Sequence, residues 1–71
     1  MKVEISFGAL SEPLAAQLKA QGLSMDRQEC ARLERDMVAL TRLSIRGLLS
    51  DGESHRARQR LLKAILSEVK R

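Results

Sequence analysis

The chain has 71 residues, of which 44% are hydrophobic and 1% aromatic, and its formal net charge is +4. A single cysteine excludes an intrachain disulfide. A structural zinc site takes about four ligands, which one cysteine and one histidine cannot supply. No apolar run approaches the roughly 18–20 residues of a membrane span. One domain, residues 1–71, is expected, and a core this small supplies only about 3–5 kcal/mol unless more surface is buried against a partner.

The first expected element is a short N-terminal strand or extended arm. Polar and apolar residues alternate from Lys2 onward, and the apolar ones are Val3, Ile5 and Phe7. Alternation with β-branched residues is typical of a strand. A lone strand is unstable, so we expect it either to pair with a second copy or a partner, or to lie as an arm on the helices.

The first helix is expected at about residues 11–21. Ser11 is its predicted cap, and Pro13 falls in the first turn, where its missing N–H group does no harm. Leucines recur at helical spacing: Leu10, Leu14 and Leu18. A glycine after residue 21 ends the helix.

The second helix is expected at about residues 25–46. It starts at Ser24 or at Asp26, and Asp26 with Glu29 forms a predicted capping box. Residues of a heptad-like seam follow at steps of three and four: Cys30, Leu33, Met37, Leu40, Ser44 and Gly47. Further apolar residues widen this seam, which predicts a helix that packs on two sides.

A helix stop and restart is predicted next. Gly47 can adopt the left-handed conformation that ends a helix without a side-chain clash. Ser50 caps the next helix, and Glu53, three residues on, reaches back to the amide of Ser50 in a capping box. The third helix, at about residues 51–69, then forms an antiparallel hairpin with the second.

The third helix carries an apolar face and a basic face. From residue 54 onward the chain has six basic residues and one acidic residue. Arg56, Arg60 and Lys63 share one face at helical spacing. This face has three open interpretations: a solvated surface, a contact for an acidic protein partner, or a contact for nucleic acid phosphates.

These elements predict an all-α fold of three helices with a C-terminal antiparallel helical hairpin. The residues expected to pack in the core or against a partner are Leu33, Met37, Leu40, Leu43, Ile45, Leu48, Leu49, Leu61, Leu62 and Ile65. Gly47, Ser50 and Glu53 are expected to hold the turn.

Residues 40–62 resemble the SHOCT domain, a short helical hairpin thought to act in oligomerisation or protein–protein contact. The resemblance is carried by Leu40-x-x-Leu43, by Gly47-x-Leu49-Ser50-x-x-Glu53 and, seven residues later, by Leu61-Leu62. Ser54 departs from the family, which usually has an aromatic residue there.

Most of the chain is also similar to small prophage-encoded proteins of no known function. The residues that carry this resemblance are Val3-x-Ile5-x-Phe7-Gly8-Ala9-Leu10, Pro13-Leu14, Gln17-Leu18, Gln21-Gly22 and Ile45-Arg46-Gly47-Leu48-Leu49. It implies a bacteriophage or integrated-phage origin and brings no activity with it.

A second family offers an alternative. A strand, a helix, a turn at Gly22 and a second helix with Glu29 in its first turn are similar to the ribbon-helix-helix fold, in which two chains pair strands and lay the ribbon in the major groove. Lys2, Glu4 and Ser6 would then face outward. Glu4 at the ribbon's centre opposes phosphate, so a dimeric DNA-binding regulator ranks second.

The function expected first is a phage-derived helical module for protein–protein interaction or oligomerisation. Its partner is a second copy or a phage or host protein, with nucleic acid as a weaker partner and no membrane. We expect no enzymatic activity, cofactor, metal or small-molecule substrate, because no convergent polar groups or pocket-sized core are predicted. Cys30 is expected as a buried small hydrophobe and His55 as an exposed first-turn residue. A lone cysteine and the lack of a signal pattern in residues 1–10 favour the cytoplasm.

Overall fold

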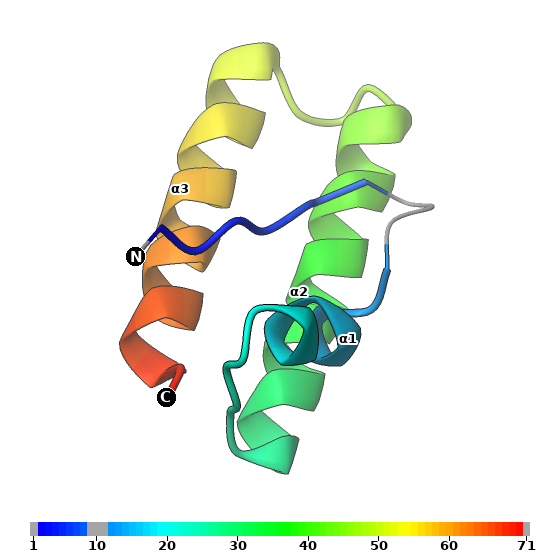
Figure 1. Ribbon diagram of the computed structural model, residues 1–71. Coiled ribbons are helices and arrows are strands. Elements are labelled where there is room, and N and C mark those ends of the chain that lie inside the picture. The colour runs from blue at the N-terminus through cyan, green and yellow to red at the C-terminus, as the bar shows by residue number, and fades with distance from the viewer. Residues whose placement is uncertain (1, 9–11, 71) are drawn as a thin grey trace.

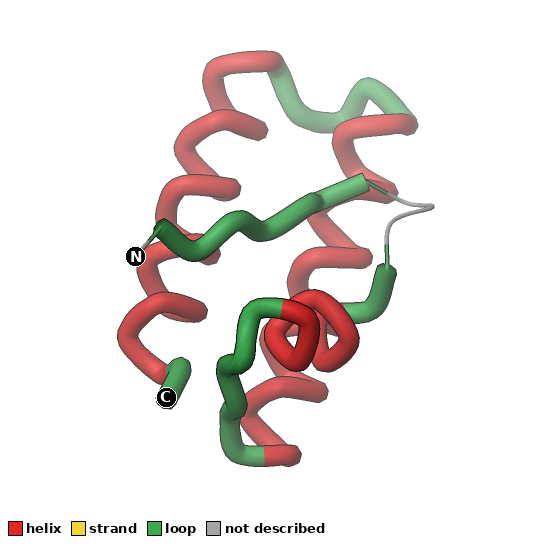
Figure 2. The backbone as a smooth tube through the Cα atoms, in the orientation of Figure 1, coloured by secondary structure: helices red, strands yellow, loops and turns green. Residues whose placement is uncertain are grey.

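Three helices make up the computed structural model, which describes residues 2–8 and 12–70 (Figure 1). They are α1 (Leu14–Ala20), α2 (Arg27–Ile45) and α3 (Asp51–Glu68). The described residues contain no strand, and the segments between the helices are loops and turns (Figure 2). The predicted all-α class is therefore confirmed.

The start of α1 lies later than the sequence predicts. Pro13 has φ −55° and ψ 151°, so it occupies the N-cap position and the helix begins at Leu14. The extended ψ of Pro13 keeps it out of the first turn, where it was predicted. Proline has no backbone N–H group, and this costs nothing here because the first N–H groups of a helix have no partner within the helix. The predicted cap Ser11, like Leu10, falls outside the described residues.

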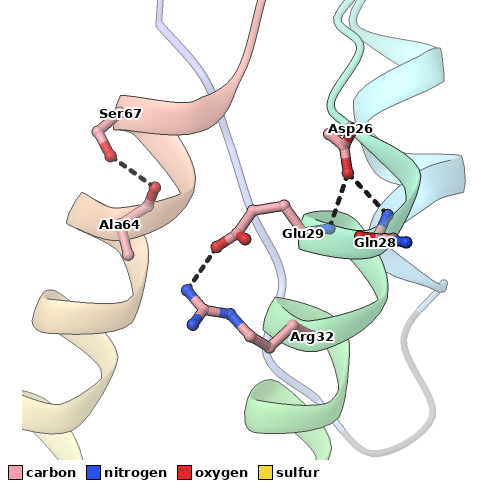
Figure 3. Close-up of polar contacts among 6 residues, drawn as sticks. All are labelled: Asp26, Gln28, Glu29, Arg32, Ala64 and Ser67. Atoms are coloured by element: carbon pink, nitrogen blue, oxygen red, sulfur yellow. Dashed lines mark hydrogen bonds and ion pairs between the residues drawn. The ribbon is translucent and has the colours of Figure 1, made fainter.

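Helix α2 begins after Asp26, one of the two predicted starts. The Asp26 carboxylate accepts hydrogen bonds from the N–H groups of Gln28 at 2.9 Å and Glu29 at 3.3 Å (Figure 3). The predicted capping box is only half formed, because the Glu29 carboxylate pairs with Arg32 instead of reaching back to Asp26 (Figure 3).

Both α1 and α2 end in a glycine turn of the same kind. Gly22 and Gly47 have φ values of 72° and 73°, which is the left-handed region where a Cβ atom is costly. The residue after each glycine donates its N–H to a carbonyl five residues back, Leu23 to Leu18 at 2.8 Å and Leu48 to Leu43 at 3.0 Å. This is the Schellman pattern of hydrogen bonds.

The turn at Gly47 leads directly into the cap of α3. The Ser50 hydroxyl accepts a hydrogen bond from the Glu53 N–H, and the Glu53 carboxylate accepts one from the Ser50 N–H, both at 3.2 Å. Both halves of a capping box are present. The bond from the Ser50 N–H lowers the pKa of Glu53, and the Ser50 side chain adds to the effect.

The turn reverses the chain, so α2 and α3 lie against each other and run in opposite directions (Figure 1). The Ser44 and Ser54 hydroxyls, one on each helix, are 3.3 Å apart. Helix α1 crosses α2 near its first half (Figure 1). The core where the three helices meet consists of Leu14, Leu18, Leu23, Cys30, Leu33, Met37 and Ile65.

The N-terminal segment, residues 2–8, crosses α2 and α3 on one side of the helix pair (Figure 2). The apolar residues Val3, Ile5 and Phe7 are partly buried against the core. Neither Val3 nor Ile5 forms a backbone hydrogen bond with another described residue. We call residues 2–8 the arm.

Two glutamines hold the arm: Gln17 in α1 and Gln21 at its C-cap. The Gln21 side-chain amide accepts from the Glu4 N–H at 2.9 Å and donates to the Glu4 carbonyl at 2.6 Å. The Gln17 amide bonds the N–H and carbonyl of Ser6 in the same way, at 2.7 and 3.2 Å. Each amide thereby takes the place that a neighbouring strand has in a sheet.

A short antiparallel bridge ties the last described residue to the loop between α1 and α2. Ser24 donates its N–H to the Lys70 carbonyl at 2.9 Å, and Lys70 donates to the Ser24 carbonyl at 2.8 Å. Ser24 was one of the two predicted starts of α2, and this pairing uses its backbone outside the helix.

Candidate functional site

The strongest candidate site is an open groove of about 640 Å³ between α2 and α3. Its apolar floor is formed by Leu33, Leu40, Leu49, Ala57, Leu61 and Ala64. Leu33 and Leu40 are buried, whereas Leu49 and Leu61 are half-buried and present part of their surface to the groove. We call this surface the α2–α3 groove.

Charged side chains form the two rims of the α2–α3 groove. Arg32 and Asp36 lie on the α2 rim, and Glu53, Arg56 and Arg60 lie on the α3 rim. Arg32 pairs with Glu29 on its own helix, and Figure 3 shows this pair extending from α2 toward the side where Ala64 of α3 lies.

Asp36, Arg56 and Arg60 form no ion pair within the described part of the chain. The groove therefore combines an apolar floor with rim charges of both signs, some of them unpaired. This combination suits a polypeptide partner, whose apolar side chains can cover the floor while its charges meet the rims.

Nine of the ten predicted packing residues divide into three groups, and Leu62 belongs to none of them. Leu33, Leu40, Leu49 and Leu61 line the α2–α3 groove. Met37 and Ile65 belong to the core, where Ile65 is fully buried. Leu62 is half-buried and lines a shallow hollow on the outer side of α3.

The third group, Leu43, Ile45 and Leu48, is exposed. Ile45 keeps 71% and Leu48 64% of its surface accessible, so the packing predicted for them is not made within the chain. The physical reason for Leu43 and Ile45 is the helix face: Ser44 between them contacts Ser54 of α3, and successive residues of a helix point about 100° apart, so its two neighbours point away from that contact. Leu48 lies in the glycine turn, before α3 starts at Asp51.

The predicted basic face of α3 divides as well. Arg56 and Arg60 stand on the rim of the α2–α3 groove, whereas Lys63 lies outside it and lines the shallow hollow beside Leu62, which Arg60 also borders. The basic residues on the groove share it with Asp36 and Glu53. An electrostatic surface of mixed sign is a weaker contact for phosphates than a purely basic one.

Four groove residues were not singled out as site residues from the sequence: Arg32, Asp36, Ala57 and Ala64. Ala57 and Ala64 both lie on the groove side of α3, and their seven-residue spacing is a usable signal for a close helix contact. Nothing in the sequence marked Asp36, because its role depends on which face of α2 borders α3.

Buried polar side chains are structural in this chain. Gln17, Thr41 and Ser54 are buried and hydrogen-bonded, Thr41 to the carbonyls of Phe7 and Met37. Burial raises the pKa of the Cys30 thiol, and the nearby Glu34 carboxylate raises it further. A protonated, buried thiol is a poor nucleophile.

Two further observations concern the residues that the structure describes. They include no group of three or more His, Cys, Asp or Glu side chains placed to hold a metal ion. None of their helices is both long and apolar enough to cross a membrane.

A more enclosed hollow of about 290 Å³ lies between the arm, α1 and α2. Gly8 and Glu12 belong to its wall, and residues 9–11 between them fall outside the described part of the chain. The α2–α3 groove is the better candidate, because all of its lining residues are described.

Comparisons of the chain with protein-family models, with curated proteins and with solved structures find no match. The functional assignment therefore rests on the groove and on the sequence.

Proposed function

We propose that the chain is a small helical protein–protein interaction module without catalytic activity, and that the α2–α3 groove is its contact surface. The observation that carries the proposal is the apolar floor shared by two antiparallel helices and bordered by charges on both sides. The resemblance of residues 40–62 to the SHOCT hairpin, and of the whole chain to prophage proteins, supports an interaction role in a phage context.

The size of the domain supports the same conclusion. The buried core is small, and several large apolar side chains remain exposed on α2, on α3 and in the turn between them: Val38, Leu43, Ile45, Leu48 and Leu66. A domain this small gains stability by burying more apolar surface against another polypeptide. A helix or helix pair fits an elongated groove of this kind through side chains at helical spacing.

The ribbon-helix-helix alternative gains no specific support from the described residues. The backbone of Glu4 and Ser6 is already paired with glutamines of the same chain. Phe7 is the one aromatic residue of the sequence, so an aromatic platform for stacking nucleic acid bases is also lacking.

A photo-cross-linking amino acid at position 56 tests the proposed function. Arg56 is exposed and lines the groove, whereas the adjacent His55 is exposed and lies outside it. In cells that produce the protein, the cross-linker at position 56 is expected to yield an adduct with a polypeptide, identified by mass spectrometry. The same cross-linker at position 55 provides the matched control.

The proposal fails if position 56 gives no polypeptide adduct, or gives the same adducts as position 55. An adduct of twice the chain mass identifies a second copy, and any other adduct identifies a different protein partner.

A further inference from the structure

We propose that the α2–α3 groove receives the α2–α3 groove of a second copy of this chain, so that four helices form a bundle. This inference rests on the proposed function, because it names the occupant of the same surface. It follows from the charges on the rims, their heights along the helices and the small side chains on the floor.

The floor of the groove permits a close approach by another helix. Ala57 and Ala64 lie seven residues apart on α3 and both face the groove, so this side of α3 presents small side chains at two successive levels. The larger side chains Leu40 and Leu61 lie on opposite helices. When two such surfaces meet, the leucines of each can fill the space over the alanines of the other, as in helical bundles.

The heights of two rim charges follow from one contact between the helices. The Ser44 and Ser54 hydroxyls, 3.3 Å apart, mark the same level on α2 and α3. Asp36 precedes Ser44 by eight residues, and Arg60 follows Ser54 by six residues on the antiparallel helix. The two charges therefore lie on opposite rims at levels that differ by two residues, or about 3 Å of helix rise.

A two-fold axis parallel to the helices makes these charges complementary. It places α2 of one copy on α3 of the other, antiparallel, and keeps every residue at its own level. Asp36 then faces Arg60 of the second copy, and the symmetry repeats the pair on the other side of the bundle. Neither residue has an ion-pair partner among the described residues of its own chain, so both are available.

The other way of stacking two grooves leaves Asp36 without a partner. An axis perpendicular to the helices places α3 on α3 and α2 on α2 of the second copy. Arg56 lies closest to the middle of the stretch from Leu49 to Ala64, so centred stacking sets Arg56 against Arg56 of the second copy, and like charges in contact oppose association. It brings Arg60 level with Glu53 of the second copy, but Asp36 meets no basic residue of the groove. The parallel axis is the arrangement that pairs Asp36, so reversal of Asp36 distinguishes the two.

Charge reversal of the two residues, alone and together, tests this bundle. Sedimentation velocity of the full chain at micromolar concentration is expected to show a dimer. Asp36→Arg and Arg60→Asp are each expected to weaken dimer formation roughly tenfold or more, because each creates two like-charge contacts. The double variant, Asp36→Arg with Arg60→Asp, is expected to restore the dimer because it exchanges the two charges.

Two controls keep the test specific. Lys63→Asp makes the same change in net charge as Arg60→Asp on the same helix but outside the groove, and it is expected to leave the dimer intact. Circular dichroism of each variant checks that the helices are retained, which is expected because Asp36 and Arg60 are exposed.

Three results would overturn the inference: a monomeric wild-type chain, a dimer that neither single reversal weakens, or a double variant that stays dissociated. A monomeric chain that still cross-links from position 56 to a different protein would refute the second copy as occupant and leave the proposed function standing.

Discussion

The two glycine turns of this chain are built alike and end up in opposite surroundings. Each has a glycine with φ near 70° followed by a leucine that bonds back five residues. Leu23, after the first glycine, is 8% exposed and belongs to the core, whereas Leu48, after the second, is 64% exposed. The hydrogen bonds of a turn reverse the chain, and the neighbouring elements decide whether its leucine contributes to stability.

Truncation of the two leucines should separate the turns most strongly. Leu23→Ala is expected to lower the free energy of unfolding by at least about 2 kcal/mol, because it leaves a cavity in the core. Leu48→Ala is expected to cost less than about 0.5 kcal/mol, since an exposed side chain loses few contacts. Urea titration followed by circular dichroism measures both. Equal losses would show that burial does not distinguish the two turns.

Substitution of the two glycines should, in contrast, affect both turns alike. Gly22→Val and Gly47→Val are each expected to cost about 1–3 kcal/mol, because a β-branched residue is strained at positive φ. A Cβ atom at either position meets no other atom within 4 Å, so backbone strain accounts for the cost.

Thermal unfolding of the two valine variants measures this strain. Gly52→Ala is the control, because Gly52 lies inside α3 with open space around it and without a positive φ. It is expected to raise stability by about 0.4–1 kcal/mol. An unchanged melting temperature for Gly47→Val would contradict the left-handed helix stop.

The cap that follows the second turn should add a dependence on pH. Ser50→Ala is expected to cost about 1 kcal/mol, because the N–H of Glu53 loses its acceptor. The hydrogen bond from the Ser50 N–H lowers the pKa of Glu53 in the folded chain. Its stabilising effect is therefore present above the ordinary glutamate pKa and is lost as the pH falls through the folded value.

Glu53→Gln tests the origin of this pH dependence. Stability measured from neutral to acidic pH should fall less steeply for Glu53→Gln than for the wild type. Identical pH profiles would assign the acid sensitivity to other carboxylates.

The bridge that ties Lys70 to the first turn should give the smallest effect. Lys70→Pro removes the N–H that bonds the Ser24 carbonyl, and Val69 before it already has the extended backbone that proline requires of its neighbour, with φ −69° and ψ 145°. A loss of about 0.5 kcal/mol is expected, at the low end for one hydrogen bond. Lys70→Ala keeps the N–H and should be neutral in the same urea titration.

Local signals predicted the helical framework well. The glycine at 47, the Ser50–Glu53 box and the Asp26 start each depend on backbone bonds within a few residues, so the sequence carries them directly. Much of the groove floor was also predictable, because three of its leucines, Leu33, Leu40 and Leu61, lie on the apolar faces of the second and third helices.

Local sequence patterns did not predict the features that depend on tertiary geometry. Gln17 and Gln21 were not identified as the residues that hold the arm, since glutamines four apart on a helix normally face solvent. The exposure of Ile45 depends on which face of α2 meets α3, and that of Leu48 on its place in the turn between the helices, and no spacing rule encodes either. Asp36 became a candidate only once the rim of the groove was defined.

Gln17 in α1 and Gln21 at its C-cap are spaced to match an extended chain. Four residues of helix rise about 6 Å and two residues of extended chain span about 6.6 Å, so amides one turn apart match every second peptide group. On the arm these bonds engage only main-chain atoms, so they would form equally well if the arm were shifted by two residues. The register of the arm is therefore determined by its apolar side chains. Shortening Ile5 or Phe7 would keep the hydrogen bonds to the glutamines but remove the contacts that select one register.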